Sequence, residues 1–243
     1  WPAAAGILAF AWVELVDVHR AEPSHLATLM LVYAAVMLVG MSFFGVRAWT
    51  SNADAFAVAF GLFALLAPLH WSGREVRLRP PLVGAVHMPQ VAGAVAVVVT
   101  MIGTTSFDGF TQGSIWTGSD GLLQSLTDTF DGIGLGREAA IQAAGTVGML
   151  TVVVLVAGLY RLGVAGMHTV GRTRSTDELS RAFAHTLIPI AFAYLLAHYF
   201  SLLAFQGQAI GYLASDPLGR GADVFGTAGW TIDYGLVGAN AIW

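Results

Sequence analysis

The 243-residue sequence contains no cysteine and no lysine. The absence of cysteine excludes disulfide bonds, thiolate metal sites and cysteine nucleophiles. All eleven basic residues are arginine, and charged residues make up only 11% of the chain. A typical soluble domain has about 25% charged residues. Since no patch of basic residues resembles a nucleic-acid-binding surface, we expect no nucleic-acid partner.

The motifs of well-known soluble enzymes are also missing. The sequence has no phosphate-binding loop, no dinucleotide-binding glycine pattern, no Gly-x-Ser-x-Gly and no His-Glu-x-x-His. It shows neither the charged start nor the cleavage site of a signal peptide. Both ends of the chain lie in apolar stretches, so we expect it to be a fragment of a longer protein.

Hydrophobic residues make up 56% of the sequence, which is the composition of an integral membrane protein. About 20 apolar residues are needed to cross about 30 Å of hydrocarbon. The apolar runs that approach this length cover residues 1–17, 26–49, 55–71, 88–106, 139–164 and 183–213. The third is short, so we expect it to cross, to re-enter or to lie in the interface. The sequence therefore predicts an all-α polytopic transmembrane helix bundle of five or six spans, forming a single membrane domain over residues 1–243.

Arginine placement predicts an orientation for this bundle. If all six segments cross, eight of the eleven arginines follow the first, third and fifth segments: Arg20, Arg74, Arg77, Arg79, Arg161, Arg172, Arg174 and Arg181. The opposite face then has Arg47, Arg137 and Arg220. The positive-inside rule places the larger group in the cytoplasm and Trp1 outside. This count loses its meaning if the third segment re-enters.

On that topology two acidic, glycine-rich loops, 107–137 and 215–243, lie on the outer side. Their tryptophans, Trp116 and Trp230, suit the depth of lipid headgroups. Within the first loop, residues 121–130 have the apolar spacing of a short helix lying on the membrane. At the inner end of the first span, Glu14 and Asp17 are interpreted as interfacial charges.

The sixth segment has a clear start. Ser175 followed by Glu178 forms a capping box, so a helix should begin near Thr176. Pro189 lacks an amide hydrogen for the carbonyl of His185, which favours a kink. The first turns should protrude into the cytoplasm because the predicted helix is longer than the membrane requires.

Helical periodicity places the polar groups of this segment in two adjacent stripes. Together the stripes give the helix a polar face that would contact water or other polar groups. The stripes are Tyr194, His198, Ser201, Phe205 and Gln208, and His185, Phe192, Tyr199 and Gln206. Three interpretations of His198 stay open: a hydrogen bond between helices, a metal ligand or general base in a cavity, and a step on a proton or solute path.

Carboxylates at the outer ends of neighbouring segments are able to meet His198. Asp54 precedes the third segment and Asp108 follows the fourth. Carboxylate and imidazole together suit a divalent metal ion or an acid–base pair. The metal-ligand candidates are therefore His198, Asp108 and Asp54, and the catalytic candidates are His198, Asp108 and Tyr199. The structural alternative makes Asp54 a helix cap and Asp108 a turn residue before Gly109.

Four stretches carry a resemblance to a known family: 185–208, Ser215-Asp-Pro-Leu-Gly-Arg-Gly221, Arg79-Pro-Pro-Leu-Val-Gly84 and Thr105-Ser-Phe-Asp-Gly-Phe110. They resemble the multi-pass actinobacterial membrane proteins catalogued as fenitrothion hydrolase-like. The resemblance covers essentially the whole chain. It implies hydrolysis of an organophosphate ester by a multi-pass protein of the bacterial inner membrane, and it transfers no catalytic residue.

Two functions follow as hypotheses. The first is a membrane hydrolase in which a metal-bound or base-activated water attacks a small hydrophobic substrate, in a polar cavity lined by the sixth helix. The second is a transporter, a permease or a non-catalytic subunit that assembles with a second membrane subunit.

Overall fold

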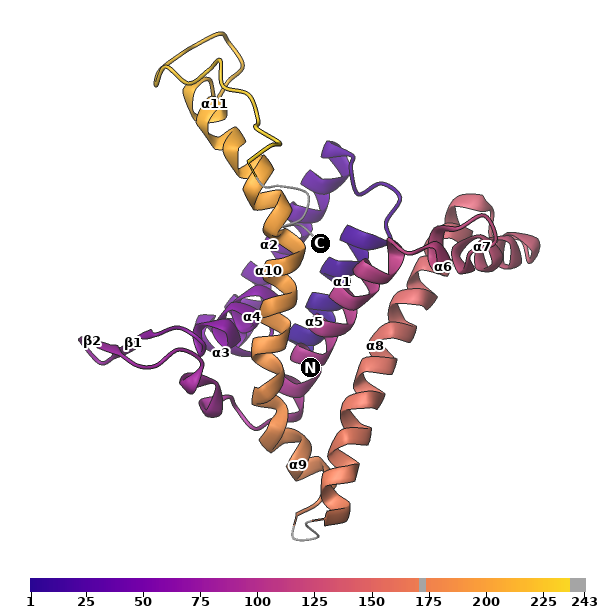
Figure 1. Ribbon diagram of the computed structural model, residues 1–243, viewed down its shortest axis with the longest axis vertical. Helices are drawn as coiled ribbons and strands as arrows, with labels where there is room; N and C mark the ends of the chain where they lie inside the picture. Colours follow the sequence, from indigo (N-terminus) through magenta and orange to yellow (C-terminus); the bar gives the residue numbers. More distant parts are fainter. Residues whose placement is uncertain (171–173, 237–243) are drawn as a thin grey trace. The chain divides into compact units, whose positions relative to one another are not determined.

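A computed structural model describes residues 1–170 and 174–236, and these residues are mostly helical (Figure 1). The chain divides into two compact units, Trp1–Ala191 and Phe192–Trp243. The all-α class predicted from the sequence is therefore confirmed for the described residues, apart from one short hairpin. Arg172 and residues 237–243 lie outside the described part, as does the side chain of Ser201.

The elements of the first unit are α1 (Pro2–Leu15), α2 (Pro23–Phe44), α3 (Val46–Asn52), α4 (Ala55–Ala64), β1 (Leu69–Ser72), β2 (Glu75–Leu78), the 3₁₀ helix η1 (Val83–His87), α5 (Ala92–Thr111), α6 (Ser114–Thr117), α7 (Leu122–Gly132), α8 (Arg137–Val170), α9 (Thr176–Phe183), the 3₁₀ helix η2 (Ala184–Leu187) and the start of α10 (Ile188–Phe205). The rest of α10, the 3₁₀ helix η3 (Gln206–Gln208) and α11 (Ala209–Ser215) belong to the second unit.

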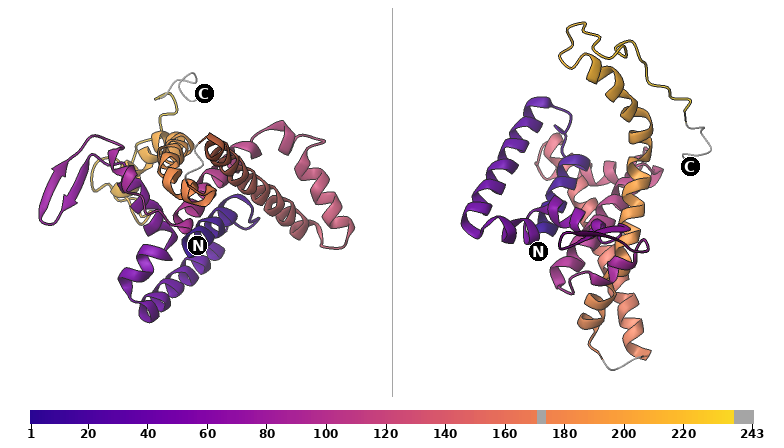
Figure 2. Two further views of the ribbon diagram at one scale, coloured as in Figure 1. Left: turned by 90° about the horizontal axis from the view of Figure 1, so that it is seen from below. Right: turned by 90° about the vertical axis from the view of Figure 1, so that its left-hand side faces the viewer.

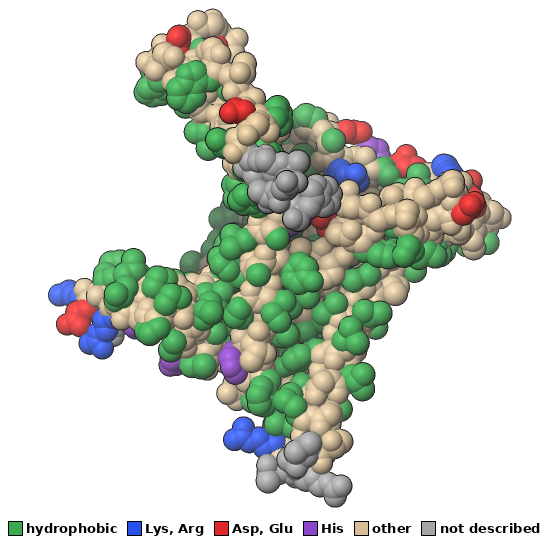
Figure 3. Space-filling view, in the orientation of Figure 1, with side chains coloured by type: hydrophobic (Ala, Val, Ile, Leu, Met, Phe, Trp, Pro, Cys, Tyr) green, Lys and Arg blue, Asp and Glu red, His purple; other side chains and the backbone are tan. Residues whose placement is uncertain are grey.

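Four helical segments among the described residues are long and apolar enough to cross a bilayer: α2, α5, α8 and the continuous α9–α10 segment. Two shorter apolar helices, α1 and α4, accompany them. Hydrophobic side chains cover the length of α8, whereas charged side chains gather at the tip of the β1–β2 hairpin and around α6 and α7 (Figure 3). This distribution fits a membrane protein, but helix length alone does not confirm five or six spans.

The core of the first unit forms where α1, α5 and α8 meet, with α5 the most buried of the long helices (Figure 2). Its largest cluster of buried side chains is Ala11, Val16, Phe107, Trp116 and Met149. Trp116 is 4% exposed, so protein covers its side chain, while its predicted depth in the bilayer stays a prediction. The side chain lies against Phe107 in an edge-to-face contact.

Contacts along the core fix the directions of its helices. Trp1 lies next to Gly93, and Ala11 and Val16 lie in one cluster with Phe107, so α1 and α5 run in the same direction. Val16 packs against Gly145 near the start of α8, which therefore runs the opposite way. Because α1 and α5 are parallel, the chain between them returns to the end at which α1 begins.

The predicted third segment, 55–71, is not one continuous helix. Its helical part, α4, has 10 residues and is about 15 Å long. A break at Ala53 and Asp54 separates it from α3, and the chain after α4 forms an antiparallel hairpin that pairs Leu69 with Leu78 and Ser72 with Glu75. Gly73, at φ +66°, supplies the positive φ that the tight turn requires.

Arg79 caps the C-terminal end of α4. Its Nη2 donates hydrogen bonds to the carbonyl oxygens of Ala64 and Leu65 at 3.1 and 2.8 Å, and its Nε donates to that of Ala67 at 2.9 Å. A helix end leaves such carbonyls without partners, and a cation also opposes the negative end of the helix dipole. A side chain at Gly84 would collide with this guanidinium, which explains the glycine at that position.

The predicted start of the sixth segment is confirmed. Ser175 caps α9 in a complete capping box with Glu178. The irregularity expected at Pro189 takes the form of the 3₁₀ helix η2, in which the amide of Ile188 donates to the carbonyl of His185. The carbonyl that a proline leaves unpaired thus receives a shorter-range bond from the preceding residue.

Candidate functional site

The predicted site residues lie in both units. His198 and Tyr199 are neighbours in α10, and their rings meet edge to face with centroids 4.5 Å apart. Asp108 lies inside α5, which continues to Thr111, so its interpretation as a turn residue is wrong. Because His198 belongs to the second unit while Asp54 and Asp108 belong to the first, their convergence stays a prediction.

Asp54 is the N-cap of α4. Its Oδ1 accepts hydrogen bonds from the amides of Phe56 and Ala57 at 3.0 and 3.1 Å, which confirms the structural interpretation of this residue. The hydroxyl of Tyr33 donates to the same oxygen at 3.1 Å. Tyr33 stands near the middle of α2, so this carboxylate lies level with the centre of that helix.

Within residues 1–170 and 174–236, no three histidine, aspartate or glutamate side chains are gathered in a way that could hold a metal ion. The proposed metal ligands His198, Asp108 and Asp54 therefore remain a sequence prediction, as does the divalent ion itself.

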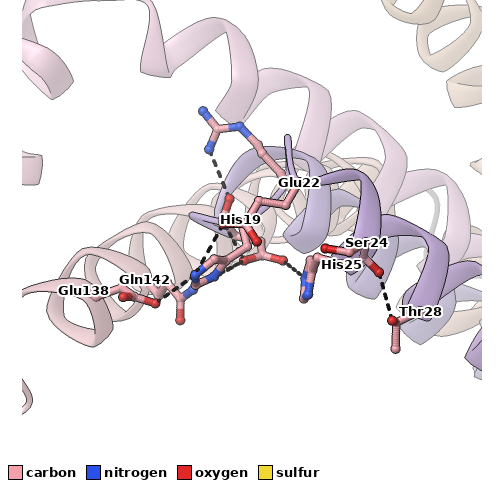
Figure 4. A network of polar contacts seen from close by, with 9 residues as sticks. His19, Glu22, Ser24, His25, Thr28, Glu138 and Gln142 are labelled. Carbon is pink, nitrogen blue, oxygen red and sulfur yellow. Dashed lines mark hydrogen bonds and ion pairs between the residues drawn. The ribbon is translucent and has the colours of Figure 1, made fainter.

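A different polar cluster stands out at the junction of α1, α2 and α8 (Figure 4). Its centre is Asp17, which is only 3% exposed. His19 and Glu22 come from the loop after α1, His25 from the first turn of α2, and Glu138 and Gln142 from the first turns of α8. We call these six residues the Asp17 cluster.

The shortest contact in the cluster joins Asp17 to His25. Oδ2 of Asp17 and Nε2 of His25 are 2.6 Å apart, a distance typical of a strong, charge-assisted hydrogen bond. Oδ1 of Asp17 accepts hydrogen bonds from the amide of His19 at 3.0 Å and from Nε2 of Gln142 at 3.4 Å. The carboxylate is thus held from the loop, from α2 and from α8.

His19 lies between three carboxylates. Its Nδ1 is 3.7 Å from Oδ1 of Asp17, and its Nε2 lies 3.9 Å from Glu22 and 3.6 Å from Glu138. The His19 side chain is 40% exposed and those of Glu22 and Glu138 are more exposed, so solvent weakens these pairs. Asp17 is the one carboxylate of the three that is shielded from water.

Backbone and side-chain bonds below the cluster position Gln142. Nε1 of Trp12 donates to Oγ1 of Thr146 at 2.8 Å, and this hydroxyl donates to the carbonyl of Gln142 at 2.6 Å. The first bond joins α1 to α8 one turn below Asp17. The cluster therefore rests on a fixed contact between two core helices.

Opposing effects act on the pKa of Asp17. Burial, the largest of them, raises the pKa, but the hydrogen bonds from the His19 amide and the His25 ring, together with positive charge on the two imidazoles, lower it more. The net pKa lies below the ordinary value of 3.8. Asp17 is therefore ionised at neutral pH, as the orienting partner of a histidine base must be.

The contact between Asp17 and His25 has the geometry of a catalytic dyad. A buried carboxylate fixes the ring and its tautomer through Nε2, while the side chain of His25 remains 35% exposed. Nδ1 of His25 has no hydrogen-bond partner among the described residues. Such a nitrogen is able to accept a proton from water or from a substrate.

The sequence alone suggests an interfacial charge at Asp17 and indicates no role for His19 or His25. The structure adds that Asp17 is buried and satisfied by hydrogen bonds, while its place at the membrane interface stays a prediction. A local signal was present, since two of the seven histidines follow this aspartate within eight residues. The contribution of Gln142, 125 residues away, leaves no local trace in the sequence.

Comparisons with known proteins give no relative: no protein family matches the chain, no curated protein is similar to it in sequence, and no solved structure matches it. The case for a function therefore depends on the geometry of the chain itself.

Acid should weaken the contribution of Asp17 to stability. Because its pKa is lower in the folded state than the unfolded value of about 3.9, its stabilisation is complete above that value and is lost as the pH falls through the folded pKa. We expect the difference in unfolding temperature between the wild type and Asp17→Asn to shrink as the pH falls from about 4 to about 3. Thermal unfolding in detergent measures it.

The matched control is Asp177→Asn, whose carboxylate is 67% exposed in an ion pair with Arg161. It should change the unfolding temperature little at any pH. A wild-type advantage over Asp17→Asn that stays constant down to pH 3 would contradict the assignment.

Proposed function

We propose that this chain is a multi-pass hydrolase of the bacterial inner membrane, in which His25, oriented by Asp17, is the general base. The single observation that carries the proposal is the 2.6 Å contact between a buried carboxylate and a partly exposed imidazole. The resemblance to the fenitrothion hydrolase-like family supports an ester of phosphoric acid as the substrate class.

The chemistry needs only water and the dyad. Nε2 of His25 keeps its proton on the Asp17 side, so Nδ1 offers the lone pair. Nδ1 takes a proton from a water molecule as the water oxygen forms a bond to phosphorus. The bond from phosphorus to the leaving oxygen breaks, and that oxygen departs with the electron pair and receives a proton from the imidazolium. Asp17 stabilises the positive charge that His25 carries between the two transfers.

The directions of the core helices support five crossings: α1, α2, α5, α8 and α9–α10. In a six-span arrangement α1 and α5 would be antiparallel, but they run in the same direction, so we propose that α3 and α4 re-enter. Arg47 and Arg20 then exchange sides, and eight arginines again share one face: Arg47, Arg74, Arg77, Arg79, Arg161, Arg172, Arg174 and Arg181. The positive-inside rule now places Trp1 in the cytoplasm and the Asp17 cluster at the outer surface.

Cysteine labelling tests this orientation directly, because the chain has no cysteine of its own. Ser24→Cys, beside the Asp17 cluster, should react with a membrane-impermeant maleimide on intact cells. Arg74→Cys, in the β1–β2 hairpin, should react only after the membrane is permeabilised. Both positions are exposed, so access to the reagent decides the result. The reverse pattern would restore the orientation with Trp1 outside.

Turnover of a chromogenic neutral phosphotriester by the purified protein in lipid nanodiscs tests the hydrolase. Wild-type protein should release the chromophore, and His25→Gln should reduce the rate about 10²–10⁴-fold, the usual contribution of a general base. His87→Gln, which changes an exposed histidine in η1, is the matched control and should leave the rate unchanged.

Two further experiments distinguish the Asp17–His25 dyad from the His198 site that the sequence predicts. If His198→Ala abolishes turnover and His25→Gln does not, the base lies in α10 and our assignment is wrong. Loss of turnover on adding a chelator would indicate a metal-dependent reaction. No turnover by the wild-type protein on phosphotriesters or carboxylic esters would remove the hydrolase proposal.

One observation favours a transporter as the second candidate. Asp54 stands at the break between α3 and α4, and this break lies at mid-depth: Ala55 packs with Ile7 of α1 and beside Met101 of α5, each near the middle of its helix. Broken helices near the bilayer centre are typical of ion and solute sites in transporters. A pH-sensitive dye inside proteoliposomes tests for proton flux, which Asp54→Asn should abolish if this candidate is right.

A further inference from the structure

The chain after α10 folds back along its own helices. We call residues 206–236, which comprise η3, α11 and the following loop, the outer module. The amide of Val224 donates to the carbonyl of Ser215 at 3.1 Å. Further back along the helices, the amide of Asp233 donates to Oε1 of the Gln208 side chain at 2.9 Å, and Nε2 of that side chain donates to the carbonyl of Asp233 at 3.1 Å. The Tyr234 ring then lies 5.5 Å from that of Phe205. Hydrogen bonds and a ring contact therefore hold the returning loop against the helices at three points along its length.

The acidic side chains of the module are occupied by the module itself. Asp216 accepts hydrogen bonds from the amides of Arg220 and Gly221 at 2.9 and 2.6 Å. Asp223 accepts from the Ser215 hydroxyl at 2.7 Å and from an amide at 3.0 Å, and Asp233 accepts from an amide at 2.8 Å. These carboxylates are partly or fully exposed, but each accepts hydrogen bonds from within the loop and so stabilises its turns.

The apolar side chains of the module point away from it. Eight of them are 55–71% exposed: Ile210, Leu213, Leu218, Val224, Phe225, Trp230, Tyr234 and Leu236. They outnumber the one cation, Arg220, and include a tryptophan and a tyrosine. Loops that are surrounded by water rarely expose so many large apolar side chains together.

The direction of α11 decides what these side chains meet. If α11 continued straight along α10, Leu213 would stand about 12 Å beyond Phe205, in water. The 3₁₀ turn of η3 interrupts the helix at Gln206–Gln208, which allows a bend at this point. The membrane is the nearest apolar environment, because α9–α10 is one of the segments able to cross it.

We infer that the outer module lies flat on the leaflet at which α10 ends, with its exposed apolar side chains inserted among the headgroups and upper acyl chains. Trp230 and Tyr234 suit this depth, since aromatic residues with one polar atom concentrate at membrane interfaces. The inference is independent of the hydrolase proposal, and the proposed topology decides only that this is the outer leaflet.

Fluorescent labels on single cysteines test the inference in nanodiscs. Leu213→Cys and Val224→Cys carry an environment-sensitive fluorophore, and Arg220→Cys in the same loop is the matched control. Lipids with a nitroxide on the upper acyl chain should quench the first two labels at least about twofold more than the control. Aqueous iodide should quench in the opposite order.

Each alternative result overturns the inference. Strong iodide quenching at Leu213 and Val224 would show that the module stands in water. Protection from both quenchers would show that protein covers this face, as a second copy or another subunit would. Leu218→Cys gives a further position if either variant fails to elute as a monodisperse, folded protein.

Discussion

Asp17→Asn should reduce the turnover of a phosphotriester by about 10²–10⁴-fold while the protein stays folded. Asparagine has nearly the same shape as aspartate and keeps an oxygen for the amide of His19, which donates to Oδ1 at 3.0 Å. It carries no charge, so it does not stabilise the imidazolium that His25 becomes when it takes a proton. The loss should fall mainly on kcat, because Asp17 is buried and acts on substrate through His25.

Asp177→Asn, which removes an exposed carboxylate, is the control for this substitution and should retain full turnover. A second readout separates orientation from simple destabilisation: the pH dependence of kcat should change in Asp17→Asn, since the base has lost its partner. If Asp17→Asn matches the wild type in rate and in pH profile, the dyad has no catalytic role.

Gly148→Val should destabilise the first unit more than any other single change proposed here. A Cβ at Gly148 would overlap the ring of Trp116 and come within 2.9 Å of Phe107, and both aromatic side chains are almost fully buried. Overpacking of this kind costs about 1–3 kcal/mol or more. For a protein of this size we expect the unfolding temperature to fall by about 3–10 °C.

Gly158→Val in the same helix is the matched control, because a Cβ at Gly158 meets nothing within 4 Å. The two substitutions share residue types and helix, so the difference in unfolding temperature reports packing against Trp116. Equal unfolding temperatures would show that α6 does not cover α8 at this point.

Local features of the fold were predictable from the sequence. The capping box at Ser175, the cap at Asp54 and the short helix α7 each depend on residues within a few positions of one another. The role of α7 was not predictable, because its inner face packs against α8 and the core cluster instead of lying only on the membrane. The apolar face of α7 is therefore covered by tertiary packing, which its local sequence does not reveal.

The errors have physical causes that a single sequence hides. Residues 69–71 end the predicted third apolar segment, yet cross-strand pairing with residues after Gly73 makes them a strand. Asp108 and Gly109 suggested a turn, but α5 continues through them to Thr111. The Asp17 cluster depends on α8 passing beside α1, and this pairing joins segments more than a hundred residues apart.

The length of α8 has a consequence for the bilayer around it. Its apolar stretch, 139–164, would span about 39 Å if straight, which exceeds the hydrocarbon thickness of about 30 Å. A tilt of about 40° accommodates the surplus, at the upper limit for spanning helices. A helix that leaned so far would diverge from α5 on the far side of the close contact of Gly103 with Val153. The hydroxyl of Tyr160 donates to the carbonyl of Ser180 at 2.6 Å, and α9 contacts both α8 and α5, so α9 lies where the two helices would part.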